Sequence, residues 1–349
     1  MRRVSRIAVA SVATAALAVT ASACGSSSSS TSAGGGDKNL GLALAYDVGG
    51  KGDQSFNDAA TAGLDQADQE FGYKSTAVEP QDGESDADKV QRLETLAKQG
   101  YNPVIGVGFA YAPAVKAAAA KFPKTTFGIV DDNQIKASNV TDLVFHEEQA
   151  SYLAGVAAAK TTKTNTVGFI GGVDVPLIHK FEAGFKQGVA DTKKGVTVKS
   201  QYLTQTAQEG GFSSPDKGEN AANGQIDAGA DVVYAAAGLS GQGVIKAASE
   251  HKIWAIGVDS DQYKQDALAK YKDSILTSAM KDVSGAVYNL AKSVKDGKPQ
   301  TGEVRASLAT GGVSLSDSNP VFKDNAALQA AIKKAEEGIK SGSITVKDS

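Results

Sequence analysis

Polar and aromatic side chains follow the predicted strands of this chain, at the strand ends where open α/β sheets place their ligands. They are Asp47, Phe56, Asn57, Asp131, Asp132, Phe212, Gly238, Asp259 and Lys281. Carboxylates accept hydrogen bonds from sugar hydroxyls, and an amide offers a donor and an acceptor to the edge of a heterocycle. Aromatic rings stack on flat bases, with about 1–3 kcal/mol per base in nucleic-acid systems. The set has no nucleophile–base pair and no evident metal cluster, so it predicts noncovalent binding of a polar, ring-shaped ligand.

The elements that must position these residues alternate along the chain. Short apolar runs, each closed by a turn, alternate with helical segments at 56–71, 111–121 and 147–160; the runs lie at 40–46, 104–108, 126–130 and 143–145. The pattern then restarts, with strands predicted at 166–170, 196–203, 231–234 and 253–256 and helices at 176–189, 218–228 and 243–251. This alternation predicts an α/β fold with parallel sheets that are buried on both faces.

Two successive sets of alternating units predict two similar lobes. We expect lobe 1 to contain residues 38–145 and to regain about 262–300, which hold a strand at 275–276 and a helix at 283–294. We expect lobe 2 to contain residues 146–261 and to regain about 301–349, with a strand at 304–308 and a helix at 325–340. Several crossings between lobes form a hinge, and a cleft lies between the lobes.

Composition narrows the class of protein. Lys plus Arg number 36 and Asp plus Glu 39 among 349 residues, for a formal charge of −3, so no basic excess favours nucleic acid. One Cys and three His exclude disulfide scaffolds, Cys-rich zinc sites and iron–sulfur clusters. We expect the three histidines to be structural or exposed. We predict no cofactor, no metal and no nucleic-acid partner.

The N-terminal 37 residues have the composition of a targeting segment and a linker. Three Arg precede the uncharged stretch 7–20, and small residues then lead to Cys24, the only cysteine. This order predicts a secretory signal peptide over 1–23, and its end resembles a bacterial lipobox. The resemblance implies cleavage before Cys24 and diacylation of its thiol, with 24–37 as a Ser/Gly-rich linker. An ordinary signal peptide that is cut near Cys24 is the alternative.

A longer motif carries a family resemblance. Residues 47–57 read Asp-Val-Gly-Gly-Lys-Gly-Asp-Gln-Ser-Phe-Asn. This segment resembles the signature of the basic membrane protein family, bacterial lipoproteins similar to the purine nucleoside receptor of ABC transporters. The resemblance spans nearly all of residues 40–315, with further matches at 151–155, 168–172, 181–185, 236–238, 257–262 and 278–281.

The resemblance implies a type I periplasmic-binding-protein fold, with two Rossmann-like lobes joined by a multi-strand hinge. It also implies roles for the residues that match the family motifs: Asp47 and Asn57 hold the purine edge, Phe56 and Phe212 stack on the base, and Gly238, Asp259 and Lys281 contact the ribose. One of Asp131 and Asp132 joins the ribose contacts, and the sequence does not choose between them. Asp53 or Ser55 is the expected N-cap of the helix at 56–71, so Asp53 is left out of the contacts.

These features together predict an extracytoplasmic protein, lipid-anchored to the cell membrane of a bacterium. We expect it to capture inosine, guanosine or adenosine by lobe closure, without catalysis, and to deliver the ligand to an ABC permease and its ATPase. The resemblance implies a monomer. A carboxylate at Asp47 accepts the N1–H of hypoxanthine or guanine, so inosine and guanosine are the expected preference. A receptor for a sugar or another small ligand, a secreted nucleoside-processing enzyme and a sensory protein stay open as alternatives.

Overall fold

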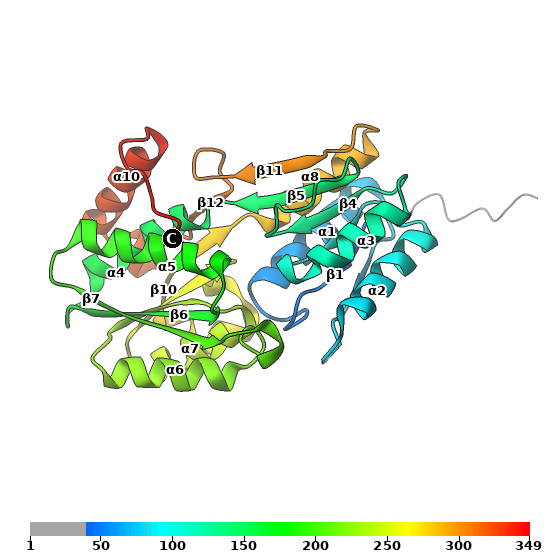
Figure 1. Ribbon diagram of the computed structural model, residues 1–349. Coiled ribbons are helices and arrows are strands. Elements are labelled where there is room, and N and C mark those ends of the chain that lie inside the picture. Colours follow the sequence, from blue (N-terminus) through cyan, green and yellow to red (C-terminus); the bar gives the residue numbers. More distant parts are fainter. Residues whose placement is uncertain (1–39, 82) are drawn as a thin grey trace, which may run out of the picture. The chain divides into compact units, whose positions relative to one another are not determined.

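Two six-stranded sheets form the centre of the protein (Figure 1). The computed structural model describes residues 40–81 and 83–349; the predicted signal peptide, Cys24 and the linker lie outside the described residues. The strand orders of the two sheets are β11-β5-β4-β3-β1-β2 and β12-β10-β9-β8-β6-β7. Strand β12 pairs antiparallel with β10, and the other pairs of described strands are parallel, as the alternation predicts. Both sheets belong to one compact unit.

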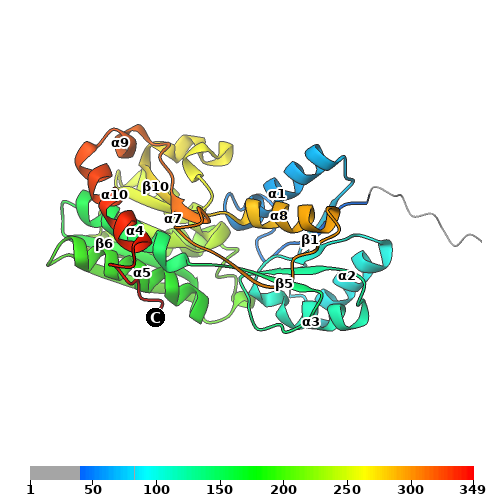
Figure 2. The same ribbon diagram turned by 90° about the horizontal axis from the view of Figure 1, so that it is seen from above.

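Helices cover both faces of the first sheet. Its strands are β1 (Ala43–Ala45), β2 (Thr76–Val78), β3 (Val104–Gly106), β4 (Phe127–Val130), β5 (Val140–Phe145) and β11 (Gly302–Ala306). Its helices are α1 (Phe56–Phe71), α2 (Asp86–Gln99), α3 (Ala112–Lys121) and α8 (Val283–Lys295). Figure 2 shows α1 beside α8 on one face and α2 beside α3 on the other. The inner strands β4 and β5 are buried on both sides, which explains their continuous apolar runs.

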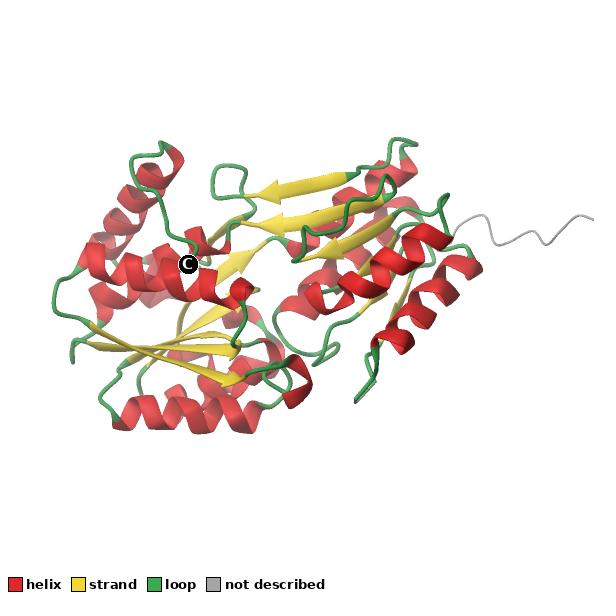
Figure 3. Cartoon of the chain, viewed as in Figure 1, coloured by secondary structure: helices red, strands yellow, loops and turns green. Residues whose placement is uncertain are grey.

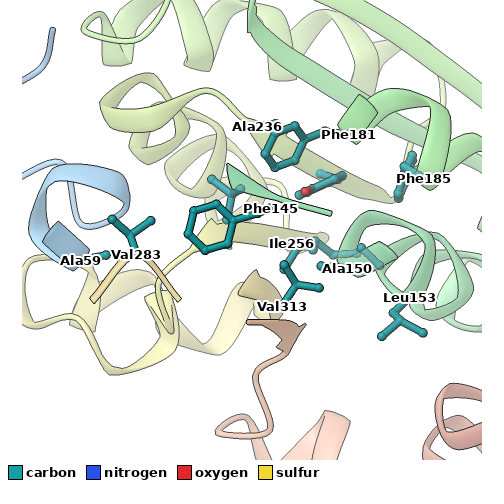
Figure 4. Packing of buried hydrophobic residues seen from close by; sticks show 14 of the residues in the cluster. Ala59, Phe145, Ala150, Leu153, Phe181, Phe185, Ala236, Ile256, Val283 and Val313 are labelled. Atoms are coloured by element: carbon teal, nitrogen blue, oxygen red, sulfur yellow. The ribbon is translucent and has the colours of Figure 1, made fainter. Parts of the chain in front are cut away.

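The second sheet is covered in the same way (Figure 3). Its strands are β6 (Thr166–Val173), β7 (Thr197–Thr204), β8 (Val232–Ala236), β9 (Trp254–Asp259), β10 (Ile275–Lys281) and β12 (Val313–Leu315). Its helices are α4 (Glu147–Thr161), α5 (Pro176–Thr192), α6 (Pro215–Asp227), α7 (Gly241–Glu250), α9 (Pro320–Lys323) and α10 (Ala326–Lys340). Figure 4 shows Phe181 and Phe185 of α5 and Leu153 of α4 among the buried side chains of this core.

The chain passes between the two sheets three times. The passages follow β5, β10 and β11 and lead to α4, α8 and β12. Helix α8 packs on α1 and α10 packs on α4. Three connections between the same two bodies are the arrangement that permits a hinge.

The sequence-based placement of two of these strands is wrong. The strand expected near 275–276 in lobe 1 is β10, which pairs with β9 in the second sheet. The strand expected near 304–308 in lobe 2 is β11, which pairs with β5 in the first sheet. Each strand extends the open edge of a parallel sheet. Apolar periodicity reports that a strand is buried and does not report which edge it joins.

Several elements, among them β2, α2, β12 and α9, are not predicted by the apolar pattern. Strand β2 is only three residues long and is partly exposed. Helix α2 is mostly polar, and its buried stripe includes Leu93 and Leu96. Its start is nevertheless marked in the sequence, because Ser85 and Asp88 form a reciprocal capping box, and Gly100 ends the helix in the left-handed conformation.

Within residues 40–81 and 83–349, no helix combines the length and the apolar character that a membrane span requires.

Candidate ligand-binding site

One pocket collects side chains from the carboxyl ends of strands in both sheets. Eight of the nine predicted contact residues line it: Asp47, Phe56, Asn57, Asp131, Phe212, Gly238, Asp259 and Lys281. The hollow holds about 520 Å³ of space outside the protein atoms, open solvent at its mouth included. The ninth, Asp132, lines a neighbouring hollow beside Lys180 and Arg305, and its carboxylate accepts a hydrogen bond from the N–H of Gln134 (2.8 Å). Asp131 lines both hollows, whereas Asp132 lines only the second, a difference that the sequence does not show.

Lys281, the last residue of β10, joins the two sheets inside the pocket. Its Nζ lies 2.6 Å from Oδ2 of Asp131, which follows β4, and 3.6 Å from Oδ1 of Asp259, which ends β9. The Lys281 and Asp131 side chains are each only 5% exposed. The same ammonium group lies 4.6 Å from the ring centroid of Phe56, within range of a cation–π contact.

The charge of Lys281 is maintained by its neighbours. Burial acts to lower its pKa, but Asp131, Asp259 and Glu147 outweigh burial and raise the pKa above its usual range. Burial also raises the pKa of Asp131, against the attraction of Lys281. A permanently protonated lysine in this position is a hydrogen-bond donor without acceptor capacity.

Backbone geometry directs the two aspartates. Asp131 and Asp259 have φ angles of 67° and 62°, in the left-handed region that Asp tolerates better than most residues. The Oδ1 atom of each carboxylate is buried without a hydrogen-bond partner among the described residues. Buried polar atoms are rarely left unpaired, so two free acceptors in one pocket indicate a ligand that supplies donors.

Asp47 follows β1 and forms a second polar group together with Asn57. The N–H of Val48 donates to Oδ1 of Asp47 (2.8 Å). Burial, followed by the charge of Asp131, raises the pKa of Asp47 to about 7, although the bond from Val48 opposes the shift. Space for this carboxylate depends on Gly108, whose φ is 98°, because a Cβ there would lie 2.5 Å from Oδ2 of Asp47.

Asn57, in the first turn of α1, is fixed by two hydrogen bonds. Its Oδ1 accepts from the N–H of Asp47 (3.0 Å), and its Nδ2 donates to Oδ2 of Asp53 (3.1 Å). One N–H and one lone pair of the amide stay free of these two bonds. Asn57 and Asp47 therefore present a donor and an acceptor side by side in the pocket.

Two phenylalanine rings complete the predicted set. Phe56 begins α1, and Phe212 lies in the segment between β7 and α6; both are partly buried. The Phe212 ring packs over Gly172 of β6, where a Cβ would meet it at 2.4 Å. Gly238 is in the left-handed conformation (φ 52°) and follows β8, near the backbone of Phe212.

Several residues that line the pocket are not predicted as contacts from the sequence. Phe181 lies in the predicted helix 176–189 and in the family match 181–185 but is not predicted as a ligand contact, and Phe109 is not predicted as one either. The further apolar lining is Val48, Leu177, Ile178, Ala236, Ala237 and Val258. Asp53 also lines the pocket, although it was expected to act only as a helix cap.

Residues 42–348 match the family model of Bmp, described as ABC transporter substrate-binding protein, PnrA-like. The chain belongs to this family. The predicted resemblance to basic membrane proteins is confirmed, and Bmp-family members are substrate-binding proteins of ABC transporters rather than enzymes.

Curated relatives and solved structures agree with the Bmp assignment. The chain is 36% identical over 325 residues to the ABC transporter nucleoside-binding protein BmpA of Lactococcus lactis, covering 88% of this chain and 89% of that protein. It is 33% identical over 291 residues to the uncharacterized lipoprotein PH1714 of Pyrococcus horikoshii, covering 80% and 69%. A solute-binding protein of an ABC transporter system from Aeropyrum pernix superposes with a TM-score of 0.78 at 25% identity, covering 89% and 94%. The type I periplasmic-binding-protein fold is thereby confirmed.

Proposed function

We propose that this Bmp-family protein captures a purine nucleoside in the pocket between its two sheets and delivers it to an ABC importer. The observation that carries the proposal is the meeting of two polar groups and two aromatic rings in one pocket. Asp47 and Asn57 form the base group; Asp131, Asp259 and Lys281 form the ribose group; Phe56 and Phe212 are the rings. The Lactococcus relative, named as nucleoside-binding, supports the same ligand class.

The ribose group matches a sugar with neighbouring hydroxyls. Each hydroxyl both donates and accepts, and the site offers both functions. The free Oδ1 atoms of Asp131 and Asp259 accept, and the Lys281 ammonium donates. Hydrogen bonds to charged groups are worth about 1.5–3 kcal/mol each, so this group supplies much of the affinity.

The base group matches a 6-oxopurine. Ionised Asp47 accepts the N1–H of hypoxanthine or guanine, and the free N–H of Asn57 donates to O6. Adenine presents an acceptor at N1 and an amino group at C6, so it opposes this pattern. Inosine and guanosine are therefore the preferred ligands in this proposal.

Binding couples to closure because the contacts come from both sheets. Asp47, Asn57 and Asp131 belong to elements of the first sheet, whereas Asp259 and Lys281 end strands of the second. A ligand that bridges them stabilises the closed arrangement, which an importer's permease recognises. We further propose that a lipid on Cys24 holds the protein outside the cell membrane; the Pyrococcus relative named as a lipoprotein supports this.

A thermal-shift panel tests the proposal. The purified protein is melted at pH 8 with inosine, guanosine, adenosine, cytidine, uridine, ribose and galactose. A ligand at 100 times its Kd stabilises by about 2.7 kcal/mol, a shift of several degrees for a protein of this size. Shifts with purine nucleosides support the proposal. Shifts with sugars alone would favour the sugar receptor, and cleavage of inosine would favour the enzyme.

The Asp47→Ala variant tests the role of the base group in the same assay. It should lose affinity for inosine by about tenfold or more and change the affinity for free ribose far less. Equal losses for both ligands would contradict the contact between Asp47 and the base.

A further inference from the structure

Asp53 makes an unusual number of hydrogen bonds for a helix-capping carboxylate. Its Oδ1 accepts from the backbone N–H groups of Ser55 (2.9 Å) and Asp58 (3.1 Å). Its Oδ2 accepts from the backbone N–H of Asn57 (2.8 Å) and from the Asn57 side-chain Nδ2 (3.1 Å). The residue is only 1% exposed, so this geometry is held by packing as well as by the four bonds.

Only three of these bonds are explained by capping. The backbone bonds satisfy N–H groups at the start of α1, which have no partner within the helix. The fourth bond goes to a side chain that lines the ligand pocket. Ser55, the residue before α1, makes no side-chain cap bond of its own, so Asp53 serves both functions.

The bond to Nδ2 decides which way round the Asn57 amide lies. A carboxylate accepts and never donates when ionised, so it selects the NH₂ group rather than the oxygen. On the other side, the N–H of Asp47 selects Oδ1. Both ends of the amide are thereby assigned by fixed partners, and its remaining N–H and lone pair each have one place in the pocket.

We propose that Asp53 is a positioning residue that sets base specificity by holding the Asn57 amide in the orientation that donates to the base. This inference rests on the proposed function. When the amide is held in this orientation, Asp47 is the acceptor and Asn57 the donor. They complement the N1–H and the O6 atom of a 6-oxopurine, respectively. Without Asp53, only the N–H of Asp47 orients the amide, so the donor is held less firmly and the pocket rejects the amino group of adenine less well.

The Asp53→Asn variant keeps two of the three capping bonds and removes the bond that positions the Asn57 amide. The Asn oxygen still accepts from the N–H groups of Ser55 and Asp58, but its NH₂ then faces the donors of Asn57. We expect the inosine-to-adenosine affinity ratio to fall by about tenfold, in line with the discrimination that one good hydrogen-bonded base contact provides. The measurement is isothermal titration with both nucleosides at pH 8.

Asp231→Asn is the matched control. Asp231 likewise accepts several hydrogen bonds, from Thr162 Oγ1 (2.6 Å) and the N–H groups of Lys163 (2.7 Å) and Thr164 (3.0 Å), and it does not line the pocket. We expect this variant to melt at a lower temperature with an unchanged affinity ratio. This result would show that a loss of stability alone does not lower the inosine-to-adenosine affinity ratio.

A double variant, Asp53→Asn with Asn57→Asp, provides the rescue. Here the Asn at 53 donates to the carboxylate at 57, which also accepts the N–H of Asp47, so the side-chain part of the network re-forms with one bond reversed, while the backbone N–H of residue 57 loses its acceptor. We expect the melting temperature to recover toward wild type while the affinity ratio stays low, because position 57 no longer carries an N–H. This variant carries the test if circular dichroism shows Asp53→Asn to be unfolded.

The outcomes are distinguishable. An unchanged ratio in Asp53→Asn, or a ratio that recovers together with the melting temperature in the double variant, overturns the role of Asp53 while leaving the nucleoside site intact. Absence of purine nucleoside binding by the wild type overturns the proposed function, and the role of Asp53 falls with it.

Discussion

Asp142 lies in the middle of β5 with both carboxylate oxygens buried and without hydrogen-bond partners. Burial raises its pKa to about 6, against the attraction of Lys136. Burial likewise raises the pKa of Asp53 to about 6 and of Glu147 to about 7. Between about pH 4 and these values, the folded chain binds more protons than the unfolded chain. The contribution of these groups to stability is therefore greatest at acid pH and falls as pH rises.

The Asp142→Asn variant tests this pH dependence of stability at a residue that does not line the pocket. At pH 8 the wild type carries a buried unpaired charge there, so the variant should be more stable by about 1 kcal/mol or more. At pH 4 both side chains are neutral and the difference should shrink. Urea unfolding at the two pH values measures this, with Asp317→Asn on the exposed surface as control. A gain of equal size at both pH values would contradict the assigned pKa.

At the scale of elements, the turns after the strands decide where the polar side chains lie. Strand β3 ends at Gly106, and Gly108 then takes a φ of 98° that leaves room for the carboxylate of Asp47. The conformation of the turn after β3 is therefore required by the neighbouring carboxylate of Asp47 as well as by the end of the strand. Asp131 and Asp259 show the same relation at the ends of β4 and β9, where a left-handed residue turns each carboxylate toward Lys281.

Gly108→Ala should reduce inosine affinity by tenfold or more, because the new Cβ displaces Asp47. Gly195→Ala is the matched control: its φ of 82° carries a similar backbone strain of about 1–2 kcal/mol, but a Cβ there meets nothing within 4 Å. We expect both variants to melt earlier and only Gly108→Ala to lose affinity in isothermal titration. Similar affinities in the two variants would show that Gly108 serves only the backbone.

At the scale of the whole molecule, residues 52–55 connect the two sheets directly. The side chains of Gln242 and Gln262 donate to the carbonyl oxygens of Gly52 (3.0 Å) and Gln54 (3.1 Å). Ser260 Oγ donates to the carbonyl of Ser55 (2.7 Å), and Ser55 Oγ donates to Oδ2 of Asp259 (2.9 Å). These bonds connect the two walls of the pocket, and three of the four involve no residue of the base or ribose group.

Gln242→Ala should therefore weaken all ligands by the same factor. One neutral hydrogen bond is worth about 1 kcal/mol, so affinity should fall about fivefold for inosine and adenosine alike, through faster dissociation. Surface plasmon resonance gives both rates, and Gln91→Ala on the exposed face of α2 is the control. A loss confined to one nucleoside would mean that Gln242 acts on the ligand rather than on closure.

The positions of most helices and strands were predictable from the sequence, whereas the partners of some strands in the sheets were not. The apolar pattern places a helix at 56–71, where α1 is found, because burial of one face leaves a periodic trace. Strands β10 and β11 were assigned to the wrong lobes, because a buried strand looks the same whichever sheet edge it joins. The partly exposed β2 and the polar α2 leave too weak a trace to find.

The candidate site shows the same division. Residues after strands are predicted from their position and from the family resemblance, and eight of the nine line one pocket. Phe181 was missed as a pocket residue because an aromatic side chain on the apolar stripe of α5 has the signature of core. Asp131 lines this pocket and Asp132 does not, and Asp131 has a φ of 67°, a backbone angle that no residue pattern encodes.

The position of β11 has a consequence for how the chain is made. Strand β5 is buried along its whole length, yet one of its edges is covered only by residues 302–306, near the end of the chain. Synthesis proceeds from the N-terminus, so for most of the time that the polypeptide is emerging, the first sheet ends in an apolar, unpaired edge. Such an edge is a template for aggregation. A chain that stops short of residue 302 therefore lacks a structural strand of its first sheet, and a premature stop so late in the message is expected to damage the part of the protein that was translated first.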